Sequence, residues 1–320
     1  MAVPFPDPFD GALADLRVTG SVLLHETYVA PWGIRIPPET ELRRMLGLGP
    51  TKRVMPFHLV LAGAFELTTG VQPPQTVTTR QVAICPGGDA HLMQAGQVPR
   101  PTPFAAIMAG TYSGARPGEG PATTLLCGVF VVDSAPLNPL LAALPAVLTV
   151  PTAGTDANPL LAHAAEMLTI EVGRGGRGSF TASRMLEVFC AEAIAGYRRE
   201  RGTDQSGWFR ALADPKVGRA IEQLHREPAR PWSVQTLAAA VALSPSRFAA
   251  RFREVTGCSV MSYVAGWRMN LACRLLRDTE HGLADIAARV GYTDVTSFSR
   301  AFKALVGTSP TGWRAQGGTS

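Results

Sequence analysis

The stretch that decides the fold is Phe248-Ala-Ala-Arg-Phe-Arg-Glu-Val-Thr-Gly-Cys-Ser-Val-Met-Ser-Tyr263, because the chain contains it twice. Fifty residues later the sequence reads Phe298-Ser-Arg-Ala-Phe-Lys-Ala-Leu-Val-Gly-Thr-Ser-Pro-Thr-Gly-Trp313. In both copies two Phe lie four positions apart, and a basic residue, a Gly, a Ser and an aromatic residue follow at the same spacing. Self-similarity at a fixed offset is the signature of a duplicated structural unit.

Each copy predicts a helix–turn–helix unit. Leu237 and Ile286 lie in matching short apolar helices upstream, and the two Phe of each copy share the inward face of the second helix because they are four residues apart. Gly257 and Gly307 are placed to end these second helices. One such unit could be an ordinary helical hairpin, but two matched units with basic residues on their outward faces favour DNA binding. The units cover residues 234–256 and 283–306.

Length and composition set the broad class of protein. A chain of 320 residues predicts two domains, and 46% hydrophobic residues is ordinary for a globular protein. No apolar run approaches the ~20 residues of a membrane span, and the first residues lack the features of a signal peptide. Five Cys without a CxxC motif fit a reducing compartment and argue against a disulfide framework or a zinc site. We therefore expect a cytoplasmic protein without a membrane partner.

Charge is distributed unevenly along the chain. Residues 207–320 contain 15 Lys and Arg against 8 Asp and Glu, a net charge of +7, whereas residues 1–206 have a net charge of −2. A basic segment of this size suggests a polyanionic partner. Solvated Arg on helix surfaces is the simpler explanation, and charge alone does not separate the two.

Residues 1–150 read as β structure, with short apolar and β-branched runs separated by Pro, Gly and Thr. Many short strands with turns between them predict a barrel or a sandwich. The whole chain is therefore predicted to be an α+β multidomain protein. The expected strands include Val22–His25, Phe57–Leu61, Phe65–Thr68, Val82–Cys85 and Leu125–Val132.

Two His residues stand out in this β region. Pro86-Gly-Gly-Asp-Ala-His91 resembles the P-x-G-x-x-H motif of the cupin barrel, in which the His faces the interior. His58, with Glu66 further on, resembles the other cupin motif, although Val60 stands where a second His belongs. Two His and a carboxylate can hold a metal, but the missing His argues against a metal here. His58, Glu66 and His91 are instead candidates for binding a small effector, and a packed core His is the alternative for His58.

Residues 151–206 change character and predict two helices, Pro159–Leu168 and Thr181–Arg199, as a linker. Met185, Val188, Phe189, Ile194 and Tyr197 form an apolar stripe on the second helix. This stripe could pack on the β region or form the seam of a homodimer.

Residues 207–320 resemble the DNA-binding domain of the AraC/XylS family of bacterial transcription regulators. The resemblance rests mainly on Ile286-Ala, Val290-Gly-Tyr292, Phe298, Arg300-Ala-Phe302-Lys303 and Gly307-Thr-Ser309-Pro310. It implies a sequence-specific regulator whose partners are double-stranded DNA, RNA polymerase and a small effector bound in a cupin-like domain. It implies no cofactor and no enzymatic activity.

By motif position, the resemblance places six residues against base edges and two against phosphates. The base-facing residues are Ser246, Arg247, Ala250, Thr296, Ser299 and Arg300. The phosphate-facing residues are Arg253 and Lys303, together with the N-termini of both second helices. The helix that joins the units, Ser262–Leu276, would set the separation of the two recognition helices.

Two other functions stay open at this point. A cupin enzyme with a DNA-binding appendage would need bound metal, which the incomplete His motif argues against. The β domain could also serve only for oligomerisation. The sequence names neither the effector nor the promoter, and it does not separate activation from repression.

Overall fold

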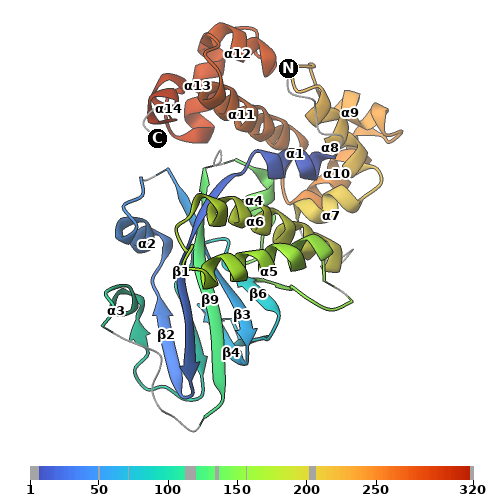
Figure 1. Ribbon diagram of the computed structural model, residues 1–320. Coiled ribbons are helices and arrows are strands. Elements are labelled where there is room, and N and C mark those ends of the chain that lie inside the picture. The colour runs from blue at the N-terminus through green and yellow to red at the C-terminus, as the bar shows by residue number, and fades with distance from the viewer. Residues whose placement is uncertain are drawn as a thin grey trace. The chain divides into compact units, whose positions relative to one another are not determined.

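The computed structural model divides the protein into two compact units, which are described separately (Figure 1). The sheet unit contains residues 17–133 and 144–201. The helical unit contains residues 202–320 together with two earlier segments, 1–16 and 134–143. The structure describes residues 7–49, 51–70, 72–111, 120–133, 137–155, 157–201 and 207–317.

The sheet unit is built on two five-stranded sheets. In the first sheet the strand order is β1-β9-β3-β6-β10, and in the second it is β5-β4-β7-β2-β8. Every pairing is antiparallel except that of β2 with β8. The strands are β1 Arg17–Val29, β2 Trp32–Ile36, β3 Arg53–Ala62, β4 Ala64–Thr69, β5 Gln75–Thr78, β6 Gln81–Ile84, β7 His91–Ala95, β8 Thr102–Pro103, β9 Ala122–Asp133 and β10 Leu148–Pro151.

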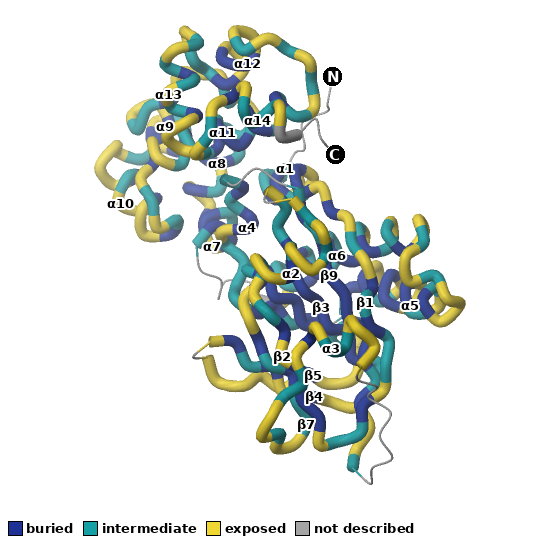
Figure 2. Tube along the Cα trace, turned by 90° about the vertical axis from the view of Figure 1, so that its left-hand side faces the viewer, coloured by how far each residue is buried: buried dark blue, intermediate teal, exposed yellow. Residues whose placement is uncertain are grey.

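Both faces of the first sheet are covered, which explains the long unbroken apolar run in β3. Residues 54–60 of this strand are all buried (Figure 2). Val54, His58 and Val60 face the second sheet, whereas Phe57 faces helix α6 (Phe180–Arg201). The Phe57 ring lies 5.8 Å from that of Phe189 on α6. A strand that is buried on both faces has no solvent-facing side, so its sequence does not alternate between apolar and polar residues.

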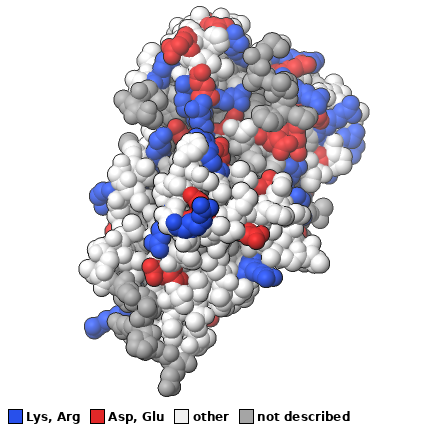
Figure 3. All heavy atoms as spheres, viewed as in Figure 1, with Lys and Arg blue, Asp and Glu red and all other residues white. Residues whose placement is uncertain are grey.

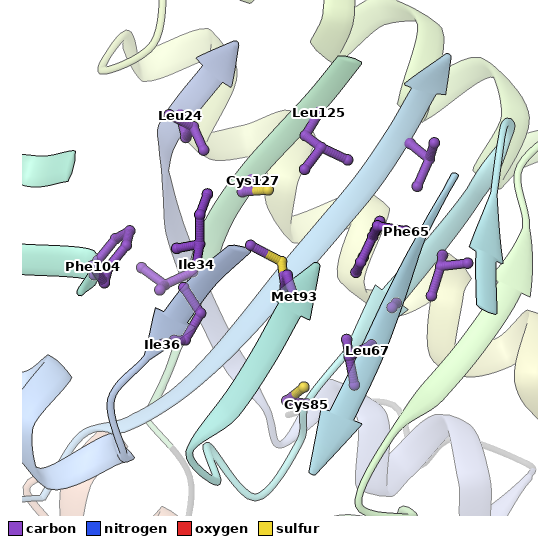
Figure 4. Packing of buried hydrophobic residues seen from close by; sticks show 14 of the residues in the cluster. Leu24, Ile34, Ile36, Phe65, Leu67, Cys85, Met93, Phe104, Leu125 and Cys127 are labelled. Atoms are coloured by element: carbon purple, nitrogen blue, oxygen red, sulfur yellow. The ribbon is translucent and has the colours of Figure 1, made fainter. Parts of the chain in front are cut away.

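The core of the sheet unit lies between the two sheets. Figure 4 shows side chains from both sheets pointing into this space, Leu125 and Cys127 from β9 and Phe65, Met93 and Ile34 from the opposite sheet. His58 lies directly across from Cys127 in the β3–β9 register, so its side chain enters the same layer. The inter-sheet space is therefore largely apolar, with a few buried polar side chains such as His58, Thr69 and His91.

The remaining helices of the sheet unit flank the sheets. Helix α6 packs on β1, β9 and β10, and helix α5 (Pro159–Gly173) packs on α6. Thus the apolar stripe predicted on the second linker helix faces the sheet at Phe189 and Ile194, while Val188 is exposed. Two short helices, α2 (Glu39–Met45) and α3 (Phe104–Met108), interrupt the region that the sequence predicted as β.

The helical unit contains two helix–turn–helix pairs joined by one long helix (Figure 1). The pairs are α9 with α10 and α12 with α13, and α11 joins them. Gly257 and Gly307 end α10 and α13 in the left-handed conformation, with φ of 77° and 88°. These positions favour Gly because a side chain is strained there. The helices are α7 Trp208–Ala213, α8 Val217–Arg226, α9 Val234–Ala240, α10 Pro245–Thr256, α11 Val260–Asp278, α12 Leu283–Arg289, α13 Val295–Val306 and α14 Pro310–Gly317.

Two helices from the N-terminal half also belong to the helical unit. Helices α1 (Pro8–Ala14) and α4 (Pro139–Ala143) pack against α8 and α7 respectively, and against each other. The Phe9 ring lies 6.2 Å from that of Phe209. The sequence predicted β structure throughout residues 1–150, and these segments differ because their apolar residues pack against helices.

Candidate nucleic-acid interface and inter-sheet site

Helix α10 has one buried face and one exposed face. Phe248 and Phe252 are buried, with ring centroids 5.7 Å apart. Ser246, Arg247 and Ala250 are exposed on the opposite side. Pro245 starts the helix, where its missing N–H removes no helical hydrogen bond. The helix therefore presents its N-terminal half to solvent as a short row of small and basic side chains.

Helix α13 repeats this arrangement fifty residues later. Phe298 and Phe302 are buried, with ring centroids 5.8 Å apart. Thr296 and Arg300 are exposed, and Ser299 is half-buried. The outward face of α13 thus carries more hydrogen-bonding groups than that of α10.

The two helices differ at their N-termini. Ser244 precedes α10 and makes no side-chain capping hydrogen bond. Asp294 caps α13, and its carboxylate accepts a hydrogen bond of 2.7 Å from the backbone N–H of Ser297. This hydrogen bond lowers the pKa of Asp294, with a smaller contribution from the nearby charge of Arg300. A carboxylate at this end opposes an anion, which argues against the expected phosphate contact at the N-terminus of α13.

Cations on the outward faces fall into two groups. Arg251 is held by Asp214, whose carboxylate accepts from its Nε at 2.7 Å. By contrast, within the described part of the chain, no hydrogen bond or ion pair engages the side chains of Arg247, Arg253, Arg300 or Lys303. These four cations are free to meet an external anion. On the face drawn in Figure 3, Lys and Arg side chains are more numerous over the helical unit than over the sheet unit.

The long helix α11 is held along its length by contacts with α7, α8 and α14. Near its start, Tyr263 Oη accepts a hydrogen bond of 2.7 Å from Trp208 Nε1. One turn further, Trp267 stacks on His225 with ring centroids 3.5 Å apart. At its other end, the Cys273 carbonyl accepts from Trp313 Nε1 at 3.1 Å. Helix α11 also packs directly on α10 and on α13, so it lies between the two exposed helices and contacts both.

Arg268 of α11 contacts the segments next to both pairs. Its Nε donates to the Pro228 carbonyl at 2.9 Å and its Nη2 donates to the Arg230 carbonyl at 2.8 Å, both in the loop before α9. Its guanidinium also lies 6.0 Å from the ring centroid of Tyr292, in the turn between α12 and α13. No role for Arg268 was predicted from the sequence, because its partners lie about 25 to 40 residues away.

In the sheet unit, His58 and His91 meet in the core. Their Nε2 atoms are 2.8 Å apart, and His91 Nδ1 donates to the Asp89 carbonyl at 2.8 Å. Burial lowers the pKa of His91 to about 4 and, with the neighbouring His91, holds the pKa of His58 well below its usual range. Both rings are therefore neutral near pH 7.

The third effector candidate lies elsewhere. Glu66 is exposed on β4, in a strand whose alternate residues Phe65 and Leu67 are buried. Its carboxylate accepts from Gln94 Nε2 at 3.4 Å. Strand alternation puts Glu66 on the opposite face from the His pair, which corrects its assignment as an effector residue. Among the residues that the structure describes, no three His, Cys, Asp or Glu are grouped so that they could hold a metal ion.

Two family models match this chain. One, described as Cupin, matches residues 7–196, and the other, described as Helix-turn-helix domain, matches residues 237–316. A search for membrane spans among the described residues finds no helix with the length and hydropathy to cross a bilayer.

Similar proteins are known from bacteria. A protein of Streptomyces antibioticus named as an AraC-like transcription regulator is 36% identical over 216 residues, which cover 67% of this chain and 71% of that protein. A protein of Streptomyces lividans with the same description is 31% identical over 265 residues, which cover 82% of this chain and 87% of that protein. Among solved structures, the DNA-binding domain of AdpA in complex with a target DNA is 27% identical, covers 32% of this chain and 92% of that chain, and has a TM-score of 0.31.

Proposed function

The chain belongs to the AraC-like family of transcription regulators, and from this we propose that α10 and α13 each enter a major groove of the same duplex. As a member of this family, the protein is a DNA-binding transcription regulator with a cupin domain, rather than an enzyme. A major groove admits one α-helix, and grooves on one face of B-DNA recur about every 34 Å. Helix α11 lies between α10 and α13 and fixes their separation and relative orientation.

The observation that carries this proposal is the matched pair of outward faces. Ser246 and Thr296 occupy equivalent positions near the starts of the two helices, and Ala250 is equivalent to Arg300. We assign these exposed positions, with Arg247 and Ser299, to base edges. Arg300 can donate two hydrogen bonds to guanine, whereas Ala250 offers only a methyl group.

Arg253 and Lys303 take the phosphate role in this proposal. They lie one turn beyond the base-facing residues at equivalent positions of the two helices, and both are exposed. Phosphate contacts fix the register of a protein on DNA without specifying sequence. The uncapped N-terminus of α10 is a third phosphate candidate, whereas Asp294 removes that of α13.

The cupin domain is proposed to bind a small effector between its two sheets. The support is the buried His58–His91 pair, which introduces hydrogen-bonding atoms into an otherwise apolar space. A ligand that binds one DNA-bound or oligomeric state better than another shifts the equilibrium between them.

Footprinting on DNA flanking the gene tests the DNA half of the proposal. Two protected stretches about one helical turn apart are expected on one face of the duplex. Affinity should also fall steeply as salt rises, because Lys and Arg displace counterions from phosphates. A single short protected stretch, or a DNA affinity that does not change with salt concentration, would contradict the assignment of two helices to two major grooves.

A further inference from the structure

A small cavity lies between the two sheets beside His58. Its volume is about 20 Å³, and apolar side chains such as Ile34, Met93 and Phe104 line it (Figure 4). Cys127 also lines it, and burial raises the pKa of this thiol, so that it stays protonated and a weak hydrogen-bonding group. His58 is the one lining residue whose side chain forms full-strength hydrogen bonds.

The hydrogen bonds of the His pair fix where the protons lie. A carbonyl oxygen only accepts, so His91 Nδ1 carries a proton and donates to Asp89. In a neutral ring, His91 Nε2 is then bare, and His58 Nε2 must carry the proton between the two rings. His58 Nδ1 is left as a bare acceptor. It is buried, and none of the residues that the structure describes forms a hydrogen bond with it.

We propose that the ligand of this site is a small, largely apolar molecule with one hydrogen-bond donor, a phenolic or alcoholic hydroxyl, which donates to Nδ1 of His58. The inference rests on the proposed effector function of the sheet unit and names the chemical class of the effector. His91 holds the acceptor in place, because its Nε2 accepts a hydrogen bond from His58 Nε2–H and its own Nδ1–H donates to the Asp89 carbonyl.

Other occupants fit the cavity less well. A buried water usually makes about three hydrogen bonds, and the lining side chains offer one strong partner. A carboxylate or phosphate would find no cationic side chain in the lining, and a sugar would bury several hydroxyls without partners. A metal ion needs more ligands than His58 supplies.

The cavity holds roughly one water as it stands, so a larger ligand must displace part of the wall. Phe104 is the side chain best placed to yield. It begins α3, a helix of five residues that packs on β2 and on the two-residue strand β8, and it is the one buried residue of that helix. Elements with few buried contacts open at low free-energy cost.

Nitrogen NMR of the His side chains in the full-length protein provides the first test, with phenol and its near-isostere toluene as probes. Before addition, His58 is expected to be protonated at Nε2 and bare at Nδ1. Phenol should move the Nδ1 resonance of His58 toward its hydrogen-bonded value, and toluene should not. If phenol shifts neighbouring resonances while Nδ1 is unchanged, the site binds ligands but the assigned class is wrong. If neither probe perturbs the sheet unit, both this inference and the proposed effector site fail.

Two substitutions give an independent test by affinity. His58→Phe removes the acceptor, whereas His58→Gln keeps a donor for His91 and an acceptor for the ligand. The ratio of phenol to toluene affinity should fall about fivefold in His58→Phe, as for the loss of one neutral hydrogen bond. It should be largely retained in His58→Gln. An unchanged ratio in His58→Phe would overturn the proposal, and the wild-type NMR result decides the question if that variant does not fold.

Discussion

Asp15 and Arg274 lie 259 positions apart in the chain and form an ion pair inside the helical unit. The Asp15 carboxylate accepts from Arg274 Nη1 at 2.5 Å and from Asn270 Nδ2 at 3.0 Å, and it is only 5% exposed. Both partners are on α11. The segment before β1 therefore packs on the helix that joins the two helix–turn–helix pairs, and it contributes to the fold of the DNA-binding unit.

Asp15→Ala is expected to lower the free energy of unfolding of the helical unit by about 1–3 kcal/mol, because Asn270 and the partly exposed Arg274 lose their partner. Urea unfolding followed by tryptophan fluorescence measures this, since four of the five Trp lie in that unit. Glu254→Ala is the matched control in the same unit. It breaks the exposed Arg210–Glu254 pair and should cost less than about 0.5 kcal/mol. Equal costs for the two variants would show that Asp15 contributes no more than a surface charge.

The sheet unit should lose stability in mild acid. Burial lowers the pKa of His91 to about 4 in the folded protein, against about 6.5 when unfolded. A neutral buried His stabilises the folded protein fully at pH values above its unfolded pKa. This stabilisation is lost as the pH falls from about 6.5 toward 4. For His91 alone the loss is on the order of 3 kcal/mol, and His58, whose pKa is also lowered, adds to it in the same direction.

Unfolding measured at several pH values tests this expectation. The double variant His58→Gln, His91→Gln should depend much less on pH in that window. His163→Gln, on the exposed face of α5, is the control and should behave as the wild type. The explanation fails if the double variant retains the wild-type dependence.

Arg268 is expected to fix the orientation of α10 relative to α13. Arg268→Met removes the hydrogen bonds to the Pro228 and Arg230 carbonyls and the contact with Tyr292. Wild-type protein should prefer an operator with its half-sites one turn apart over operators with one or two added base pairs. The variant should reduce this preference roughly three- to tenfold, corresponding to one or two hydrogen bonds. Arg289→Ala, which breaks an exposed pair with Asp285, should leave the preference intact. Equal effects would mean that Arg268 does not set the spacing.

The helical unit was the part best predicted from sequence, because its signals are local and repeated. Phe248 and Phe298 mark inward faces through a spacing of four residues, and Gly257 and Gly307 mark helix ends through their left-handed conformation. Both kinds of signal act within one or two helical turns, so the sequence alone carries them.

What the sequence did not predict depends on contacts between distant segments. The assignment of α1 and α4 to the helical unit rests on Asp15, Phe9 and Asn138, whose partners lie far along the chain. Contacts of this kind leave no periodic pattern in the sequence from which they could be predicted. In the sheet unit, the motif around His91 indicated an inward His. The unpartnered Nδ1 of His58 follows only from the tertiary pairing of the two rings.

The two recognition helices should contribute unequally to base discrimination. Ala250 and Arg300 occupy equivalent positions, but only Arg300 can form hydrogen bonds. Ala250→Gly is therefore expected to change operator preference little in the first half-site, with a thymine methyl contact as the most it can lose. A competition assay against randomised half-sites measures this. A large loss of preference in the first half-site would contradict the inequality.

Binding of Arg300→Ala and Lys303→Ala to a panel of single-base operator variants tests the central claim most directly. Arg300 is exposed, and within the described residues no hydrogen bond or ion pair engages its side chain, although its charge lies near the Asp294 carboxylate. It can therefore reach a guanine edge. Its loss should cost about 1–3 kcal/mol and abolish discrimination at one position of the second half-site. Lys303→Ala should weaken binding to every member of the panel alike. A uniform penalty for Arg300→Ala across the panel would contradict base reading by α13 and leave Arg300 a phosphate contact.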